Sequence, residues 1–248
     1  MPRFFAEREN IKDTYIIIDN EDVNHISRVL RLGEGDEITV CDGQGFDYKA
    51  LIREINSKQI VCDILEKNKS NTEPNIEVIL FQGLPKASKM DYIIQKTTEL
   101  GISKIVPCAL SRCVVKLENK KAESKKTERW QKIAQAAAKQ SGRGIVPEIS
   151  MPVSFSEALE QLKKCDICFV PYECEEINTL KRVLTSVKEP KTVGFIVGPE
   201  GGFDPAEIEK ISEAGINTIT LGKRILRTET AGEAVLSMIM YEIGDINK

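Results

Sequence analysis

Two glycine-rich loops carry the residues of this chain that are best suited to hold a small ligand. The first reads Gly198-Pro199-Glu200-Gly201-Gly202, and the second runs from Gly222 to Ala231. Glycine lets a backbone approach a ligand closely and exposes N–H groups that bind anions such as phosphate. However, the chain has neither a Gly-x-Gly-x-x-Gly after a strand nor a P-loop motif. A dinucleotide or a nucleoside triphosphate is therefore poorly supported as the ligand.

Buried strands are expected to position both loops. Apolar runs at residues 192–197 and 216–221 predict strands that end at the first and the second loop. A helix is expected between them, with Asp204 as its N-cap, Pro205 and Glu207 in its first turn and Gly215 just past its end. This is a βαβ arrangement. Its loops fall at the carboxyl edge of a parallel sheet, where ligands bind.

The same loops resemble those of a known family. The strings IVGPEGGF and LGKRILRTETA are similar to the C-terminal signature of the SPOUT methyltransferases, above all of the branch that methylates N3 of a uridine in 16S ribosomal RNA. The strings LPKASKMDYIIQKTTELGI and QSGR match too, although Ala87-Ser88 stands where Gly-Asp is expected. The resemblance implies a deep trefoil knot that binds S-adenosylmethionine. Physical rules alone would not predict this knot, because threaded chains are very rare.

The resemblance also implies how the cofactor is bound. S-adenosylmethionine has no phosphate, so backbone groups are expected to read its adenine and ribose while apolar side chains pack around the purine. We expect no metal ion, because the chain lacks a cluster of metal ligands. The expected cofactor-binding residues are Leu84, Gly198, Pro199, Glu200, Gly201, Leu221, Gly222, Ile225, Leu226 and Thr228.

Methylation of uridine N3 requires that a proton leave and that two flanking carbonyl oxygens take up negative charge. A base and a cationic donor are therefore needed. Arg227 is the first candidate for the donor and Arg143 the second. The single histidine, His25, lies far from the loops in the sequence and is expected to be structural, which leaves Glu200 and Glu229 as candidate bases. A purely structural role is also open for both, since an acid stabilises the first turn of a helix.

The first 70 residues predict a separate small β-barrel. A helix is expected at about 21–30, with strands at 15–18, 37–41, 46–55 and 59–65. The string HISRVLRL followed by GEGD resembles the PUA-like RNA-binding barrel of the same family. That resemblance places Arg3, Arg28 and Arg31 on RNA. Residues 67–75 are polar and are interpreted as a linker between domains.

Residues 76–248 predict an α/β domain, because strands and helices alternate along this part of the chain. Strands are expected at 76–81, 102–107, 113–115, 166–170, 192–197 and 216–221, and helices at 90–100, 123–141, 154–163, 177–187, 205–214 and 229–243. The last helix has two apolar stripes, where a surface helix needs one. The second stripe, Leu236, Met240 and Ile243, is interpreted as part of a homodimer interface, although a further layer of the same domain would also explain it. The dimer would bring Arg143 near the cofactor loops of the partner.

Charge and composition limit the partners. The net charge is −3, but residues 112–143 contain ten basic and three acidic residues, which is typical of a surface that binds a polyanion and also of a solvated helix. No apolar run is long enough to span a bilayer and no signal peptide is apparent, so a cytoplasmic location is expected. Cys165 and Cys168 form a Cys-x-x-Cys pair without further ligands nearby, and we expect them to be structural.

The leading hypothesis is thus S-adenosylmethionine-dependent methylation of uridine N3 in 16S rRNA. One alternative is a SPOUT enzyme that methylates another base or a ribose in tRNA or rRNA. A second, from a different class, is an RNA-binding assembly protein without catalytic activity. The intact glycines and Arg227 argue against the latter.

Overall fold

The computed structural model describes residues 2–116 and 119–247. The chain forms two compact units. The first contains residues 1–73 and 138–146, and the second contains residues 74–137 and 147–248.

The first unit is built on a curved five-stranded sheet with the order β1-β3-β4-β5-β2. Its pairs are antiparallel except for the parallel pair of β1 and β3, and two register shifts bend the pairing of β4 with β5. The strands are β1 (Arg3–Phe5), β2 (Tyr15–Ile18), β3 (Glu37–Cys41), β4 (Phe46–Ile55) and β5 (Ile60–Lys69), with a 3-10 turn η1 (Arg8–Asn10), a short α1 (Asp22–Asn24) and a π-helical turn η2 (His25–Val29). The four predicted strands are confirmed, and β1 was missed because three residues give no periodicity.

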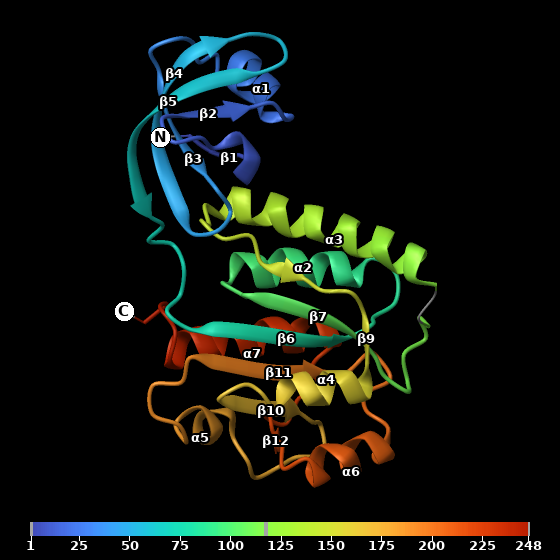
Figure 1. Cartoon of the computed structure of the whole chain (residues 1–248). Helices are drawn as coiled ribbons and strands as arrows, with labels where there is room; N and C mark the ends of the chain where they lie inside the picture. Colours follow the sequence, from blue (N-terminus) through green and yellow to red (C-terminus); the bar gives the residue numbers. More distant parts are fainter. Residues whose placement is uncertain (1, 117–118, 248) are drawn as a thin grey trace. The chain divides into compact units, whose positions relative to one another are not determined.

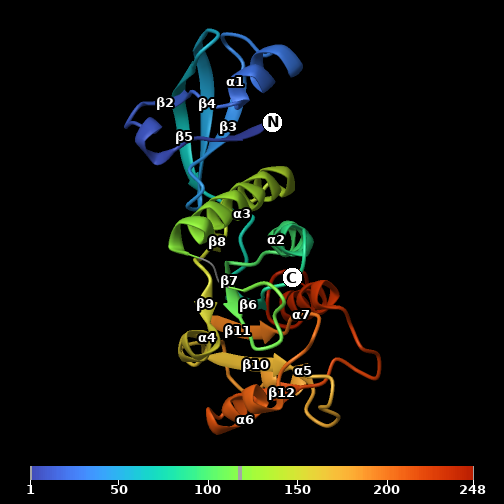
Figure 2. The same cartoon turned by 90° about the vertical axis from the view of Figure 1, so that its right-hand side faces the viewer.

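The second unit contains a parallel sheet with the order β12-β10-β11-β6-β7-β8, and β9 also pairs with β7. Its strands are β6 (Glu77–Gly83), β7 (Lys104–Ala109), β8 (Glu148–Ile149), β9 (Val153–Ser154), β10 (Ile167–Pro171), β11 (Thr192–Val197) and β12 (Asn217–Ile219). The helices are α2 (Lys89–Glu99), α3 (Lys120–Ser141), α4 (Phe155–Leu162), α5 (Leu180–Leu184), α6 (Pro205–Glu213) and α7 (Thr228–Glu242), and the last turn of α3, from residue 138, belongs to the first unit. Figure 2 shows α4 and α7 on opposite faces of β11. The predicted α/β class with a parallel sheet is confirmed.

The local signals around the predicted βαβ unit act as expected. Asp204 accepts a hydrogen bond from the amide of Ala206 (3.1 Å), and Glu207 accepts one from the amide of Asp204 (2.9 Å). Pro205 opens α6, and Gly215 follows it with φ of +70°. The capping box thus determines where α6 begins, and Gly215 determines where it ends before the edge strand β12.

One predicted strand is wrong. Residues 113–115 lie in a turn, where the amide of Cys113 donates to the carbonyl of Leu110 (3.0 Å). A run of three apolar residues is too short to distinguish a strand from a buried turn.

The interpretation of the second apolar stripe on α7 is also wrong. Leu236 and Met240 have no exposed surface in the single chain, because α7 packs against α2 and α5 as well as against β6 and β11. Leu236 and Met240 are therefore part of the core of the second unit, whereas Ile243, the third member of the stripe, is only half-buried. The exposed apolar residues of this helix are instead Met238 and Tyr241, at 40% and 58% exposure.

Among the described residues, no helix combines the length and the apolar character that a membrane span requires. The location of the protein in the cell stays a prediction.

Candidate functional site

The two glycine-rich loops meet at the carboxyl edge of the parallel sheet and enclose a hollow of about 450 Å³. Residues 197–203 form one wall and residues 225–228 the other, with Lys89, Pro171, Glu173 and Ala231 between them. A smaller hollow next to it is lined by Leu221 and Gly222 and shares Ile225 and Leu226 with the first. Nine of the ten predicted cofactor residues line one or the other hollow. The exception is Leu84.

Buried hydrogen bonds join the two loops to the end of β6. The hydroxyl of Thr228 donates to the carbonyl of Gly198 (2.6 Å) and accepts from Nε2 of Gln82 (2.9 Å). Gln82 is fully buried and Thr228 nearly so, which makes these bonds costly to lose. A Cβ atom on Gly83 would lie 2.7 Å from the backbone nitrogen of Pro199. Glycine is therefore required for β6 to end this close to the first loop.

Lys89, the first residue of α2, connects both candidate bases. Its Nζ lies 3.0 Å from Oε1 of Glu200 and 3.3 Å from Oε2 of Glu229. The hydrogen bond with Glu200 is the main reason why the pKa of Lys89 is raised, so this ammonium group stays charged. Burial opposes the ionisation of Glu200. Even so, its own backbone amide, the Lys89 ammonium and the Lys86 amide together hold the pKa of Glu200 below its ordinary value.

Arg227 stands at the N-cap position of α7, lines the hollow and is exposed. Its guanidinium forms neither a hydrogen bond nor an ion pair with any residue that the structure describes. Ile225, two residues earlier, is 86% exposed. The second loop thus presents a free cation and an apolar side chain at the hollow, and both can contact a bound molecule.

Two contacts of the first loop were not predicted. A Cβ atom on Gly201 would lie 3.0 Å from Cβ of Arg112, whose Nη1 donates to the Gly201 carbonyl (3.2 Å). A Cβ atom on Gly202, where φ is +67°, would lie 3.0 Å from Oε1 of Glu173. Lys89, Arg112 and Glu173 are therefore site residues that the sequence analysis missed. For Glu173 a signal existed, since it lies three residues past the end of a predicted strand whose carboxyl end lies at the same edge.

Arg143 and Leu84 lie outside the hollow. Arg143 belongs to the first unit, where it is buried and forms an ion pair with Glu73 (2.6 Å). Leu84 is buried and lines a different hollow of the second unit. The catalytic role of Arg143 and the cofactor role of Leu84 stay predictions.

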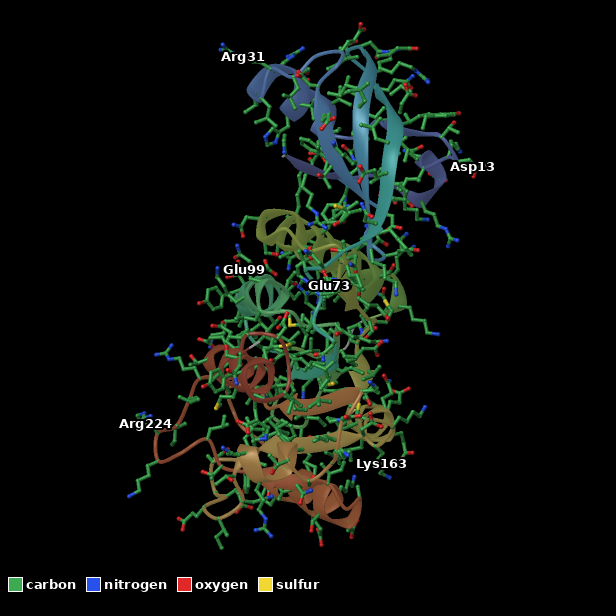
Figure 3. All side chains as sticks on the ribbon, turned by 90° about the vertical axis from the view of Figure 1, so that its left-hand side faces the viewer. Asp13, Arg31, Glu73, Glu99, Lys163 and Arg224 are labelled. Carbon is green, nitrogen blue, oxygen red and sulfur yellow. The ribbon has the colours of Figure 1, made fainter. Side chains whose placement is uncertain are left out.

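The three arginines predicted to bind RNA differ in their surroundings. Arg3 is held by Asp47 at 2.6 Å and by Ser70 at 3.2 Å within the first unit. Arg28 and Arg31 are exposed, and neither pairs with an acid in the part of the chain that the structure describes. Figure 3 shows Arg31 pointing away from its unit. Arg28 and Arg31 are thus available to a polyanion, whereas Arg3 is engaged in an internal ion pair.

The basic segment at residues 112–143 is partly neutralised by acids from outside it. Four of its ten cations form ion pairs of this kind: Arg112 with Asp204, Arg129 with Asp91, Lys139 with Asp22 and Arg143 with Glu73. The charge that the segment offers to a partner is therefore smaller than the sequence indicates.

The Cys-x-x-Cys pair has the properties of packed thiols. Cys165 and Cys168 are free and partly buried. Burial raises the pKa of Cys165 to about 11 and also raises that of Cys168, so neither is a reactive thiolate near neutral pH. Among the described residues, no group of three or more His, Cys, Asp and Glu side chains could hold a metal ion.

Comparison with known proteins places this geometry in a family. A family model described as an RNA methyltransferase domain matches residues 72–240, and one described as an RNA methyltransferase PUA domain matches residues 18–65. Ribosomal RNA small subunit methyltransferase E of Bacillus subtilis is 39% identical over 98% of this chain and 97% of its own length. The protein of that name from Mesomycoplasma hyopneumoniae is 34% identical over 96% of this chain and 98% of its own.

A solved structure agrees with these relatives. The crystal structure of a ribosomal RNA small subunit methyltransferase E from Neisseria gonorrhoeae, bound to S-adenosyl methionine, has 31% sequence identity. It superimposes with a TM-score of 0.86 and covers 99% of both chains. The PUA-like and SPOUT resemblances of the sequence are thereby confirmed. The trefoil knot and the exact domain boundaries stay predictions.

Proposed function

The chain belongs to the family of RNA methyltransferases that includes ribosomal RNA small subunit methyltransferase E, and from this premise we propose that it methylates N3 of a uridine in 16S rRNA with S-adenosylmethionine. The observation that carries the proposal is Arg227, which has no side-chain partner among the described residues, in a hollow also lined by Lys89, whose ammonium group pairs with both candidate bases, Glu200 and Glu229. An arginine without an internal partner is suited to stabilise an anion that forms during a reaction.

The residues present fit S-adenosylmethionine. The hollow of about 450 Å³ lies within the range of ~300–1,000 Å³ that small-molecule sites occupy. Glu173 and Glu200 place two carboxylates in the lining, and either can contact the positively charged sulfonium centre of the ligand. Glycines 198 and 201 leave the backbone open to it, and Ile225 and Leu226 offer apolar surface for a purine.

S-adenosylmethionine supplies an activated methyl group, and the chain must align the acceptor and control its charge. Arg227 donates to the carbonyl oxygen of the uracil that becomes negative as N3 loses its proton. Glu229 accepts that proton. The lowered pKa of Glu200 reduces its proton affinity, which makes it poorly suited to act as the base. Lys89 orients both carboxylates and stays protonated.

We also propose a homodimer that contacts its partner through the exposed side of α7 at Met238 and Tyr241. In such a dimer Arg143 would serve the site of the partner if its ion pair with Glu73 opened. The binding partner on the RNA side is the small ribosomal subunit or its rRNA, contacted in part by Arg28 and Arg31.

Methyl transfer to 16S rRNA with the purified protein tests the proposal. The RNA, naked or in assembled small subunits, is incubated with isotope-labelled cofactor, digested and analysed by mass spectrometry. We expect labelled 3-methyluridine at one position. Label on a ribose or on another base would favour a different SPOUT activity. RNA binding without any transferred label would favour the assembly protein.

A further inference from the structure

A second hollow lies in the same unit, next to the segment that connects β6 to α2. It measures about 270 Å³ and is lined by Leu84, Pro85, Ala87, Met90, Val115, Lys116, Glu123, Lys126, Arg129, Trp130 and Pro152. This volume is below the range of ~300–1,000 Å³ that is usual for sites of drug-sized ligands. The hollow is thus suited to a single ring system.

The lining combines an apolar interior with a cationic edge. Leu84, Met90 and Trp130 are buried, and prolines 85 and 152 add apolar surface. Lys116, Lys126 and Arg129 line the edge together with Glu123, and the charge of Arg129 is balanced by its ion pair with Asp91 (2.6 Å). Aromatic and apolar walls next to cations are the features with which proteins bind an unstacked base and its phosphate.

Trp130 provides a second, independent observation. The indole is 5% exposed, and its Nε1 has no hydrogen-bond acceptor within residues 2–116 and 119–247. A buried N–H donor without an acceptor is uncommon in native proteins. A carbonyl oxygen of a bound pyrimidine or purine would supply one if the hollow opened slightly around it.

The segment that lines the second hollow also carries Lys89 of the first hollow. Leu84, Pro85 and Ala87 line it, whereas Lys89, two residues further on, bridges Glu200 and Glu229. Between them, the amide of Lys86 donates to Glu200 (3.1 Å), and Ala87 has φ of +52°. A non-glycine residue in this left-handed region is strained, and such strain often accompanies function. Occupation of the second hollow would therefore bear directly on the position of Lys89.

We propose that this second hollow binds a nucleobase of single-stranded RNA that flanks the methylated nucleotide. The inference rests on the proposed function for its substrate class. The base packs among Leu84, Met90 and Trp130, and a phosphate contacts Lys116 at the edge. The site thereby selects RNA in which a neighbour of the target is unpaired.

Trp130 is the only tryptophan of the chain, so its fluorescence reports on this hollow directly. The full-length wild type is titrated with a short oligouridylate that carries a terminal dye, and tryptophan emission and dye anisotropy are followed together. We expect saturable quenching of Trp130 with the same midpoint as the anisotropy change. Binding seen by anisotropy with unchanged tryptophan emission would overturn the proposal.

A pair of neighbouring variants tests the location. Val115 lines the hollow, whereas Val114 is 64% exposed and does not. Val115→Phe should fill the hollow, weaken oligouridylate binding by about tenfold through the loss of base stacking, and abolish the quenching. Val114→Phe should behave as the wild type. Equal affinity and equal quenching in both variants would exclude the hollow as the binding site.

Two readouts separate this proposal from the proposed function. Both variants should bind S-adenosylmethionine as the wild type does, measured by calorimetry, and Val115→Phe should raise the KM for 16S rRNA more than it lowers kcat. If the wild type transfers no methyl group to rRNA but shows the quenching, the proposed function fails and the hollow remains an RNA site. If a peptide of a ribosomal protein quenches Trp130 and oligouridylate does not, the RNA proposal is wrong.

Discussion

The ammonium group of Lys89 lies 3.0 Å from Glu200 and 3.3 Å from Glu229, so the two candidate bases share one cation. Glu200 has a lowered pKa and accepts hydrogen bonds from its own backbone amide and from that of Lys86, so it serves best as a fixed anion. Glu229 keeps the role of base in the proposed reaction. Arg227, two residues before it, is then the group that carries the charge of the developing anion.

Replacing Arg227 tests that assignment. Arg227→Ala should lower kcat by about 10²–10³, the effect of removing one donor to a developing anion. The affinity for S-adenosylmethionine should be unchanged, because the guanidinium acts on the uracil. Lys223→Ala, in the same loop but outside both hollows, is the matched control. If calorimetry shows that the affinity for S-adenosylmethionine falls by as large a factor as kcat, Arg227 is instead a cofactor-binding residue.

Ala87 stands where the family resemblance predicts glycine, and its φ of +52° explains why glycine suits this position. Ala87→Gly should raise the free energy of unfolding by about 0.5–1 kcal/mol, because relief of left-handed strain exceeds the entropic cost of glycine. Ala136→Gly, at an exposed position within α3, should lower it by about 1 kcal/mol. Urea unfolding measures both. A destabilised Ala87→Gly variant would mean that the methyl group contributes to packing.

At the scale of the elements, the site depends on the ends of β6, β11 and β12 meeting the start of α7. Thr228, the first residue of α7, reaches Gly198 after β11 and Gln82 near the end of β6. The hydroxyl group therefore fixes three segments that are far apart in the sequence.

Thr228→Val removes this hydroxyl with little change in shape. We expect a loss of about 1–3 kcal/mol in stability, because the carbonyl of Gly198 and the amide of Gln82 stay buried without their partner. Cofactor affinity should fall with it, since the two loops are no longer held together. Thr228→Ser keeps the hydroxyl and should retain most of both properties in urea unfolding and calorimetry. If the two variants have the same stability and the same cofactor affinity, the hydrogen bonds of the Thr228 hydroxyl do not hold the loops together.

The segment between β10 and α5 carries Glu173 to the hollow, and Glu175 holds its shape. Hydrogen bonds from the Thr218 hydroxyl and from the amides of Ile177 and Asn178 lower the pKa of Glu175 from 4.5 to about 2. Because the folded-state pKa is depressed, this stabilisation is complete above pH 4.5 and is lost as the pH falls toward 2.

Glu175→Gln should therefore reduce the pH dependence of stability in that window. Between about pH 6 and pH 3, the midpoint of urea unfolding should fall less for the variant than for the wild type. Glu176→Gln, at the adjacent exposed position, should follow the wild type. If the midpoint of urea unfolding depends on pH in the same way for all three proteins, Glu175 does not contribute to the loss of stability in acid.

For the whole molecule, the burial of α7 decides how a partner can dock. Met240 is fully buried in the single chain, and its Cε would lie 3.2 Å from a Cβ atom added to Gly101. An interface on this helix must instead use Met238 and Tyr241.

Two lysine substitutions separate core from interface. Met240→Lys should unfold the protein, because it buries a charge without a partner. Tyr241→Lys should leave a folded chain that light scattering finds monomeric and that methylates poorly, if the partner completes the site. Ile177→Lys, at an 81% exposed position, should stay dimeric. A wild type that is monomeric and fully active at micromolar concentration would exclude the shared site.

The sequence by itself determined the local features. Asp204, Pro205 and Gly215 delimit α6 through bonds within a few residues, and the apolar runs of β6, β10 and β11 mark a buried parallel sheet. The two glycine loops were found for the same reason, since a loop after a buried strand must lie at the carboxyl edge.

Only the tertiary structure decided which distant groups meet. Lys89 is 111 residues from Glu200 and 140 from Glu229, and no periodicity relates them. In the sequence, Arg3 and Arg143 have no visible partner. In the folded chain, Arg3 pairs with Asp47 and Arg143 pairs with Glu73. The second apolar stripe of α7 was interpreted as a surface for a partner, because the sequence does not show that α7 packs against α2. Charge pairing and burial depend on the packing of the whole chain, whereas caps and strand ends depend on their immediate neighbours.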